Sequence, residues 1–177
     1  MIITLMGYMG SGKTTFGKQL ARKLSYHFFD LDAEIEKNEG LSISEIFSEK
    51  GEAYFRETES KILTNLLRNK NDVVLSLGGG TPCFFNNLDL IKKQSLSVYI
   101  KLPVKTLAQR LQQSNKNKRP LISGLNSKEL NDFIEKQLIE REKFYLQADV
   151  VIEPLNEKRK WHDIIINHPR FSRVIDK

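Results

Sequence analysis

The sequence holds only one cysteine, Cys83, among its 177 residues. No disulfide can therefore form within the chain, and folding must rest on a packed core, which a chain of this length can build. A single free thiol is typical of proteins in a reducing compartment, so we expect a cytoplasmic location.

Long apolar runs are also missing. No stretch reaches the length that is needed to cross a bilayer. The first ten residues, MIITLMGYMG, lack the basic segment of a signal peptide and lead straight into a glycine-rich loop. We therefore expect no membrane partner.

Metal-ligand patterns and a concentrated basic surface are missing as well. Cys83 and the three histidines show no spacing typical of a metal site, and no Ser-His-Asp set stands out. The formal net charge is +6, but the basic residues are scattered apart from the short cluster NEKRKWH. This pattern favours small anionic ligands over a nucleic-acid partner.

The sequence does contain short apolar segments that alternate with segments whose apolar residues recur at helical spacing. Strands are predicted at 2–7, 26–32, 72–80, 96–102 and 149–153, and helices at 13–24, 42–67, 104–113, 128–147 and 161–166. In the helix at 42–67, Ser42 and Glu45 form a capping-box pattern, and Gly51 is expected to break the helix in two. The strands are too apolar to be half exposed, which predicts an α/β fold: one domain over 1–177, a five-stranded parallel sheet between two helical layers.

The stretch GYMGSGKT, residues 7–14, matches the phosphate-loop pattern G-x-x-x-x-G-K-[ST] in full. A predicted strand precedes it and a predicted helix follows it, as this kind of site requires. Its glycines let backbone N–H groups converge on an anion, Lys13 can reach the β- and γ-phosphates, and the Thr14 hydroxyl can bind Mg²⁺. The motif predicts nucleotide binding, but phosphoryl transfer does not follow from it alone.

Two acids, Asp30 and Asp32, follow at the expected end of the second strand. The carboxyl ends of parallel strands form the ligand crevice, and alternate residues of a strand share a face, so both acids could point toward the phosphate loop. One could serve Mg²⁺ and the other an acceptor hydroxyl. The alternative is a pair of solvated carboxylates that cap the next helix.

Two further features have both a functional and an ordinary interpretation. Arg56 and Glu59 could clamp a substrate carboxylate or simply pair along their helix. The run Gly78, Gly79 and Gly80 suggests that something, most simply substrate, approaches the backbone closely, although a loose turn would also fit.

Arginines elsewhere allow similar alternatives. Arg119, in the polar loop SNKNKRPLISGLNS, could close over nucleotide or be solvated. Arg110 could stack on adenine or be exposed, and Arg141 shares a helix face with Tyr145.

From residue 7 to about residue 151 the chain resembles the shikimate kinase family. The resemblance rests on GYMGSGKTT, DLD, GLSISEIFSEKGEAYFRETE, LSLGGG, RPLI and REKFY in this order. The phosphate loop alone is shared by very many families, whereas DLD, GEAYFRETE and the triple glycine together are far more specific. Ile122 departs from the leucine expected in RPLI, and the tail beyond Val151 shows no motif that can be placed in the family.

The resemblance implies a P-loop kinase fold of the nucleoside monophosphate kinase type, with a mobile lid at about 114–127. It implies transfer of the ATP γ-phosphoryl group to the 3-hydroxyl of shikimate, with Mg²⁺ as cofactor and a monomeric chain, on the route to chorismate and the aromatic amino acids. The implied catalytic residues are Lys13, Asp32 and Arg119. The implied ATP-binding residues are Gly10, Ser11, Gly12, Lys13, Thr14, Thr15, Arg110 and Arg119, and the metal-binding residues are Thr14 and Asp30, the latter through water. The implied shikimate-binding residues are Asp32, Arg56, Glu59, Gly78, Gly79, Gly80 and Arg141, with Glu59 supporting Arg56.

Two other functions stay open on the sequence alone. One is another small-molecule P-loop kinase, such as a gluconate kinase, which would not need two arginines for a ring carboxylate. The other is a non-catalytic nucleotide-dependent regulator, although no appended domain supplies an effector surface.

Overall fold

A computed structural model of the chain describes residues 1–113, 122, 124–155 and 160–171. In chain order the elements are β1 (Ile2–Met6), α1 (Lys13–Leu24), β2 (His27–Asp30), α2 (Leu31–Glu39), α3 (Ile43–Asn69), β3 (Val73–Ser76), the 3₁₀ turn η1 (Thr81–Cys83), α4 (Asn87–Gln94), β4 (Leu96–Ile100), α5 (Val104–Gln113), α6 (Ser127–Tyr145), β5 (Val150–Ile152) and α7 (Trp161–Ile166).

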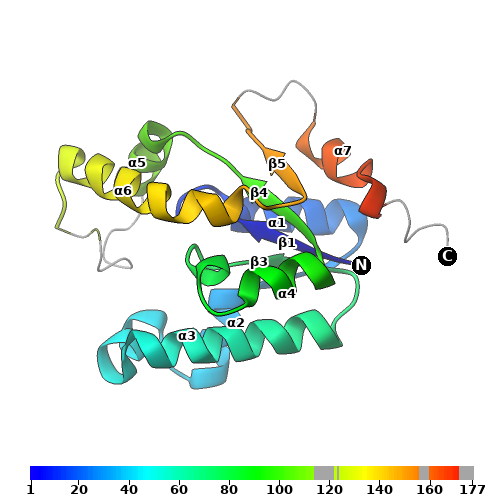
Figure 1. Cartoon of the computed structure of the whole chain (residues 1–177), viewed down its shortest axis with the longest axis horizontal. Coiled ribbons are helices and arrows are strands. Elements are labelled where there is room, and N and C mark those ends of the chain that lie inside the picture. Colours follow the sequence, from blue (N-terminus) through cyan, green and yellow to red (C-terminus); the bar gives the residue numbers. More distant parts are fainter. Residues whose placement is uncertain (114–121, 123, 156–159, 172–177) are drawn as a thin grey trace.

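The strands form one five-stranded sheet in the order β2-β3-β1-β4-β5, and every pair in it is parallel. The central strand β1 pairs with β3, where Ile2 lies opposite Val73, and with β4, where Ile3 lies opposite Leu96. In Figure 1, α5 and α6 lie on the side of the molecule away from both chain ends. The expected fold is therefore confirmed, and all five strands present their carboxyl ends to one edge of the sheet.

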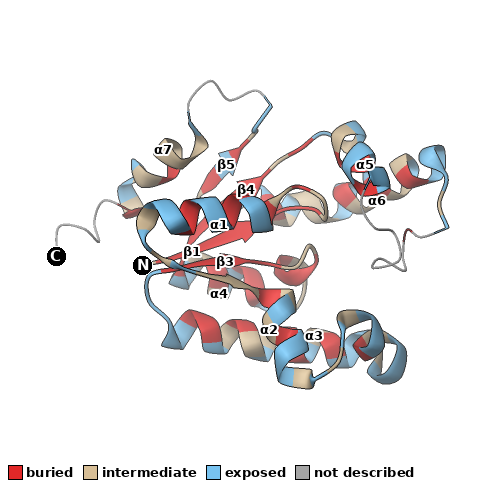
Figure 2. Ribbon diagram, turned by 180° about the vertical axis from the view of Figure 1, so that it is seen from behind, coloured by how far each residue is buried: buried red, intermediate tan, exposed pale blue. Residues whose placement is uncertain are grey.

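Helices cover both faces of the sheet, because successive strand residues point to opposite sides. Ile2 and Met6 of β1 join one apolar core with α3, α4 and α6, while Ile3 and Leu5 join the other with α1 and α7. Figure 2, seen from behind, shows α1 in front of strands that are buried along most of their length. The three layers explain why the strands read as continuous apolar runs.

Local sequence signals predicted several boundaries correctly. The Ser42 side chain accepts a hydrogen bond from the Glu45 N–H, and Glu45 bonds back to the Ser42 N–H, which completes the expected capping box. Gly51 leaves helical geometry at φ 81° and ψ 170°, so α3 is two helices joined at this residue. The bounds of α5 and α7 agree with the prediction.

The prediction was wrong in two places. Strand β2 ends at Asp30, and the chain turns at once into α2, so Asp32 lies in the first turn of a helix rather than on the strand. The segment after the glycines was not recognised as structured, although it contains η1 and α4. Most of the expected lid at about 114–127 lies outside the described residues.

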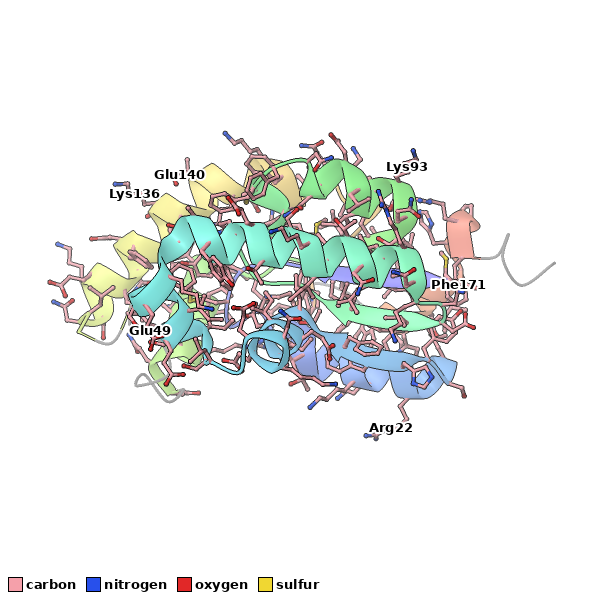
Figure 3. The ribbon with its side chains drawn as sticks, turned by 90° about the horizontal axis from the view of Figure 1, so that it is seen from below. Arg22, Glu49, Lys93, Lys136, Glu140 and Phe171 are labelled. Carbon is pink, nitrogen blue, oxygen red and sulfur yellow. The ribbon has the colours of Figure 1, made fainter. Side chains whose placement is uncertain are left out.

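The outer faces of the helices carry charged side chains. Figure 3 shows Arg22, Lys93 and Lys136 projecting away from α1, α4 and α6. Within the part of the chain that the structure describes, no helix has both the length and the apolar character that a membrane span requires.

Candidate active site

The phosphate loop joins the carboxyl end of β1, the central strand of the sheet, to the start of α1. Gly10 and Gly12 have φ of 80° and 94°, values that residues other than glycine seldom adopt. Between them, the Ser11 N–H donates to the Tyr8 carbonyl at 3.1 Å. A Cβ on Gly7 would lie 2.8 Å from the Ile100 carbonyl oxygen, so the loop packs tightly against β4. The loop therefore curls tightly directly before α1, and the N-terminus of a helix is where backbone N–H groups can bind an anion.

Lys13 and Ser11 supply the polar side chains of this loop. The Lys13 amine is buried and donates to the Gly7 and Tyr8 carbonyls at 2.8 and 3.0 Å. The Ser11 hydroxyl is buried and has no hydrogen-bond partner among the described residues. Buried polar groups are normally satisfied, and a phosphate oxygen would satisfy this one. Thr14 and Thr15 follow as exposed residues in the first turn of α1.

Thr14 and Asp30 form the first contact between the loop and the end of β2. The Thr14 hydroxyl donates to Asp30 Oδ2 at 2.8 Å. Asp30 occupies the N-cap position of α2, but its side chain makes no cap hydrogen bond, so the capping alternative is wrong for this residue. The pair presents two hard oxygen donors, the ligand type that Mg²⁺ prefers. Among the described residues, no group of three or more His, Cys, Asp or Glu offers a rival metal site.

Asp32 lies beside this pair although it belongs to α2. A Cβ on Gly78 would lie 3.0 Å from Asp32 Oδ1, so the carboxylate sits against the turn that follows β3. Burial raises the pKa of Asp32, the charges of Asp30 and Glu59 raise it further, and Lys13 opposes them, with a result of about 6. The two acids are therefore close, as expected, but through a strand-to-helix turn rather than through strand alternation.

Arg56 and Glu59 are paired on α3 and are largely withdrawn from solvent. Arg56 Nη1 donates to Glu59 Oε2 at 2.8 Å, and the two side chains are 11% and 0% exposed. The other edge of the guanidinium, Nε and Nη2, contacts Glu52 Oε1 at 3.3 Å, and Glu52 is 58% exposed. One edge of Arg56 is thus fixed by a buried carboxylate, while the other holds a long, exposed contact that a ligand can replace.

The three glycines after β3 make room for site side chains. A Cβ on Gly80 would lie 2.8 to 3.0 Å from the Arg56 guanidinium, and one on Gly79 would lie 3.6 Å from Arg141 Nη1. None of the three has positive φ, so space rather than backbone freedom requires glycine at positions 78 and 80, whereas a Cβ on Gly79 would make only ordinary contacts. The close approach that the sequence suggested is made, in this structure, by the chain's own side chains.

Arg141, from α6, lies on the other side of this turn. Its guanidinium is 5.8 Å from the Tyr8 ring, and the Tyr145 hydroxyl beside it donates to the Gly79 carbonyl. Burial raises the pKa of Cys83, and the nearby charges of Arg141 and Arg56 both lower it. The two arginines therefore flank one region at the glycine turn.

Arg110 and Arg119 were both expected at the nucleotide. Arg110 Nη1 donates to the Ser11 carbonyl at 3.2 Å and lies 3.5 Å from the Gly10 carbonyl, which brings α5 onto the outside of the phosphate loop. Arg119 lies outside the described residues.

Sequence reasoning missed two residues that touch this arrangement. The Thr81 hydroxyl donates to Glu59 Oε1 at 2.6 Å, and the Phe84 ring centroid lies 4.1 Å from Arg56 Cζ. The position of Thr81 directly after the glycines was an available signal. Nothing in the local sequence distinguishes Phe84 from an ordinary apolar residue.

A phosphate loop at the end of the central strand of a parallel sheet, with a Thr–Asp pair beside it and a fixed arginine opposite, defines a P-loop kinase. A family model described as shikimate kinase matches residues 9–168. A shikimate kinase from Flavobacterium psychrophilum is 45% identical over 151 residues, 85% of this chain and 87% of the relative.

Solved structures agree with this match. A shikimate kinase from Bacteroides thetaiotaomicron superposes with a TM-score of 0.83 at 37% identity, covering 99% of this chain and 98% of the other. One from Acinetobacter baumannii, in complex with shikimate, gives 0.80 at 30% identity, with coverage of 99% and 94%. The chain belongs to the shikimate kinase family and is an ATP-dependent kinase. The match extends past Val151, where the motifs in the sequence end.

Proposed function

We propose that this chain transfers the γ-phosphoryl group of ATP to the 3-hydroxyl of shikimate, which gives shikimate 3-phosphate and ADP. The observation that carries the proposal is the Arg56–Glu59 pair, which holds a guanidinium edge beside Asp32 and the glycine turn. A planar cation with one fixed edge matches a ring carboxylate in two parallel hydrogen bonds. The solved relative from Acinetobacter baumannii binds shikimate.

The donor would be held by the loop. Backbone N–H groups of Gly10 to Thr15 would bind phosphate oxygens, the Ser11 hydroxyl would gain a partner, and the Lys13 amine would leave the loop carbonyls for the β- and γ-phosphates. Arg110 would support the loop from outside, and Arg119 would add charge over the nucleotide.

The metal in this proposal is Mg²⁺, held by the Thr14 hydroxyl and, through water, by Asp30. When bound, it supplies positive charge to the phosphate oxygens. The protein's own contribution is the hydrogen bond between Thr14 and Asp30, which sets the direction of both oxygen donors before substrate arrives.

The acceptor would be held by three positive or acidic groups. Arg56 and Arg141 would bind the carboxylate, Gly78, Gly79 and Gly80 would line the ring, and Asp32 would accept a hydrogen bond from the reacting hydroxyl. With a pKa raised to about 6 by burial and neighbouring acids, Asp32 is ionised at neutral pH and is a stronger base than an ordinary aspartate. It can therefore take the hydroxyl proton as the new P–O bond forms.

An ADP-release assay tests this function directly. The purified chain is assayed with ATP and Mg²⁺ plus shikimate, plus gluconate, or without acceptor. We expect release with shikimate to exceed the other two at least tenfold. Release with gluconate alone would identify another small-molecule kinase, and release that no acceptor stimulates would favour a nucleotide-dependent regulator.

Arg56→Ala tests the role of the arginine. We expect the KM for shikimate to rise by about two orders of magnitude, because the variant leaves a buried carboxylate unpaired as well as removing the fork. The affinity for ATP, measured separately by calorimetry, should stay within about twofold. An equal loss of ATP affinity would remove Arg56 from the carboxylate site.

A further inference from the structure

The Glu59 carboxylate has two partners, and only one of them is the arginine. It is 0% exposed, it accepts from Arg56 Nη1 at 2.8 Å through Oε2, and it accepts from the Thr81 hydroxyl at 2.6 Å through Oε1. A buried carboxylate is held in place only while both oxygens are satisfied. The direction in which Glu59 holds Arg56 therefore depends on Thr81.

Thr81 is itself fixed from behind. Its carbonyl accepts from Asn87 Nδ2 at 3.0 Å, and Asn87 Oδ1 accepts from the Ser60 hydroxyl at 2.7 Å. Thr81 and Asn87 are both 0% exposed. The chain of bonds starts and ends on α3 and passes through η1 and the start of α4, so the turn after the glycines is tied to the helix that carries Arg56.

Phe84 limits the remaining freedom of the guanidinium. Its ring centroid lies 4.1 Å from Arg56 Cζ, closer than the 4.9 Å of the neighbouring Phe55 ring. An arginine stacked on an aromatic ring keeps its N–H groups in one plane and retains them for hydrogen bonding at the edges. The Phe84 ring thus restricts the guanidinium from one side, whereas Glu59 accepts a hydrogen bond from its inner edge.

The outer edge of Arg56 has a longer contact with a more exposed partner than the inner edge has. Glu52 contacts it at 3.3 Å, is 58% exposed, and comes from one turn earlier in the same helix. Long, exposed ion pairs contribute little. Arg56 can therefore keep its inner contact with Glu59 while a substrate carboxylate replaces Glu52 at the outer edge.

We propose that Thr81 and Phe84 are positioning residues for substrate carboxylate recognition: Thr81 orients Arg56 through Glu59, and Phe84 holds the plane of its guanidinium. The inference rests on the proposed function, in which Arg56 binds the carboxylate of shikimate. It assigns a role to Thr81 and Phe84, which lie directly after the LSLGGG motif and outside the motifs on which the family resemblance rests.

Thr81→Val removes the hydroxyl and keeps the side-chain shape, and Thr81→Ser keeps the hydroxyl. Loss of a hydrogen bond to a charged group costs about 1.5 kcal/mol or more, which corresponds to about tenfold in a binding constant. We therefore expect Thr81→Val to raise the KM for shikimate about tenfold. The KM for ATP should stay within about twofold, and Thr81→Ser should remain close to the parent chain. Phe84→Leu keeps an apolar side chain without a ring face and should raise the KM for shikimate roughly threefold to tenfold.

Shikimate methyl ester, which lacks the carboxylate, separates positioning from general damage. We expect the preference for shikimate over the ester in kcat/KM to fall about tenfold in Thr81→Val and to fall also in Phe84→Leu. Glu52→Gln, which alters only the exposed edge, should keep that preference or increase it. If Thr81→Val does not fold, the same preference can be measured in Phe84→Leu, because Phe84 is only half buried and its substitution disturbs the core less.

Three results would overturn the inference: unchanged preference in both variants, equal losses for shikimate and its ester, or a Thr81→Ser variant as impaired as Thr81→Val. Each of these presupposes a parent chain that phosphorylates shikimate. A parent chain without shikimate-dependent ADP release would instead overturn the proposed function, so the two failures are distinct.

Discussion

The Thr14 hydroxyl donates to Asp30 Oδ2 at 2.8 Å, and this one hydrogen bond joins the first turn of α1 to the end of β2. Both residues lie at the edge where the parallel strands end. The bond aligns a hydroxyl and a carboxylate oxygen beside the phosphate loop, and among the described residues no group of three or more His, Cys, Asp or Glu offers a rival set of ligands. A metal held here would depend strongly on each of the two.

Asp30→Asn should therefore weaken activation by Mg²⁺. The amide keeps the shape of the side chain but loses its charge, and changes of this kind around a metal cost roughly ten- to hundredfold in metal affinity or activity. The measurement is the Mg²⁺ concentration that gives half-maximal activity at saturating ATP and shikimate. Asp89→Asn, at an exposed acid on α4, is the matched control. A half-maximal concentration within twofold of the parent value would rule Asp30 out as a support for the metal.

The activity should fall as the pH is lowered through about 6. Burial, with the charges of Asp30 and Glu59, raises the pKa of Asp32 to about 6, and only its ionised form can accept the hydroxyl proton. Below that pH, kcat/KM for shikimate should fall about tenfold per pH unit. Asp32→Asn should leave a much lower rate that lacks this acidic limb. A parent rate that stays level between pH 7 and pH 5 would contradict the assignment of Asp32 as the base.

Gly80→Ala should impair shikimate binding without touching the nucleotide site. The added methyl group would lie 2.8 to 3.0 Å from the Arg56 guanidinium, which cannot move away without losing its contacts with Glu59 or Phe84. Moving a substrate-binding group out of place lowers activity by roughly ten- to hundredfold. The KM for shikimate should therefore rise by about this factor, while the KM for ATP stays unchanged.

Gly79→Ala provides the comparison for that variant. Its nearest contact, Arg141 Nη1, would lie 3.6 Å from the new Cβ, an ordinary van der Waals distance. We expect a smaller effect than at Gly80. Equal effects at the two glycines would show that the turn itself, and not the space beside Arg56, determines the loss.

The described C-terminal segment around Arg170 should depend on Asp149 for its stability. Asp149 accepts from the Ser97 N–H and hydroxyl at 2.9 and 2.6 Å and from Arg170 Nη1 at 2.7 Å. Burial raises the pKa of Asp149, but these hydrogen bonds outweigh it and hold the pKa below its ordinary value of 3.8. The stabilisation is therefore present at neutral pH and is lost only as the pH falls below about 3.8 and through the folded-state value.

Asp149→Asn should lower the free energy of unfolding by about 1 to 2 kcal/mol near pH 7 and lower the midpoint temperature by a few degrees. Asp163→Asn is a suitable control, since its ion pair with Lys23 is 3.3 Å long and both side chains are nearly half exposed. That variant should change the free energy by less than about 0.5 kcal/mol. Equal losses in the two variants, measured by urea denaturation, would refute the special role of Asp149.

Features set by neighbours in the sequence could be predicted well. The pairing of Ser42 with Glu45 spans three residues, and Gly51 interrupts its helix through its own backbone geometry. The phosphate loop is likewise one continuous segment, so its glycines, Lys13 and Thr14 were recognisable together. The last helix, expected around Trp161 to Ile166, has these bounds in the structure.

Features set by packing between distant segments could not. Asp32 reaches the site through a helix that begins directly after Asp30, and the two acids alone did not show at which residue the strand ends. Thr81 and Phe84 take their positions from contacts with α3, which lies earlier in the chain. The pairing of Arg56 with Glu59 was predictable, but its burial depends on how α3, η1 and β3 pack together.

The strand order has a consequence for how the chain acquires its native form. Strand β1 precedes the other four strands of the sheet along the chain, yet its backbone partners lie far from it in sequence, with Ile2 opposite Val73 and Ile3 opposite Leu96. Closing such long loops costs entropy before any pairing repays it, so this central strand must wait for both neighbours. The phosphate loop begins where β1 ends, so we expect the ATP site to form late in folding.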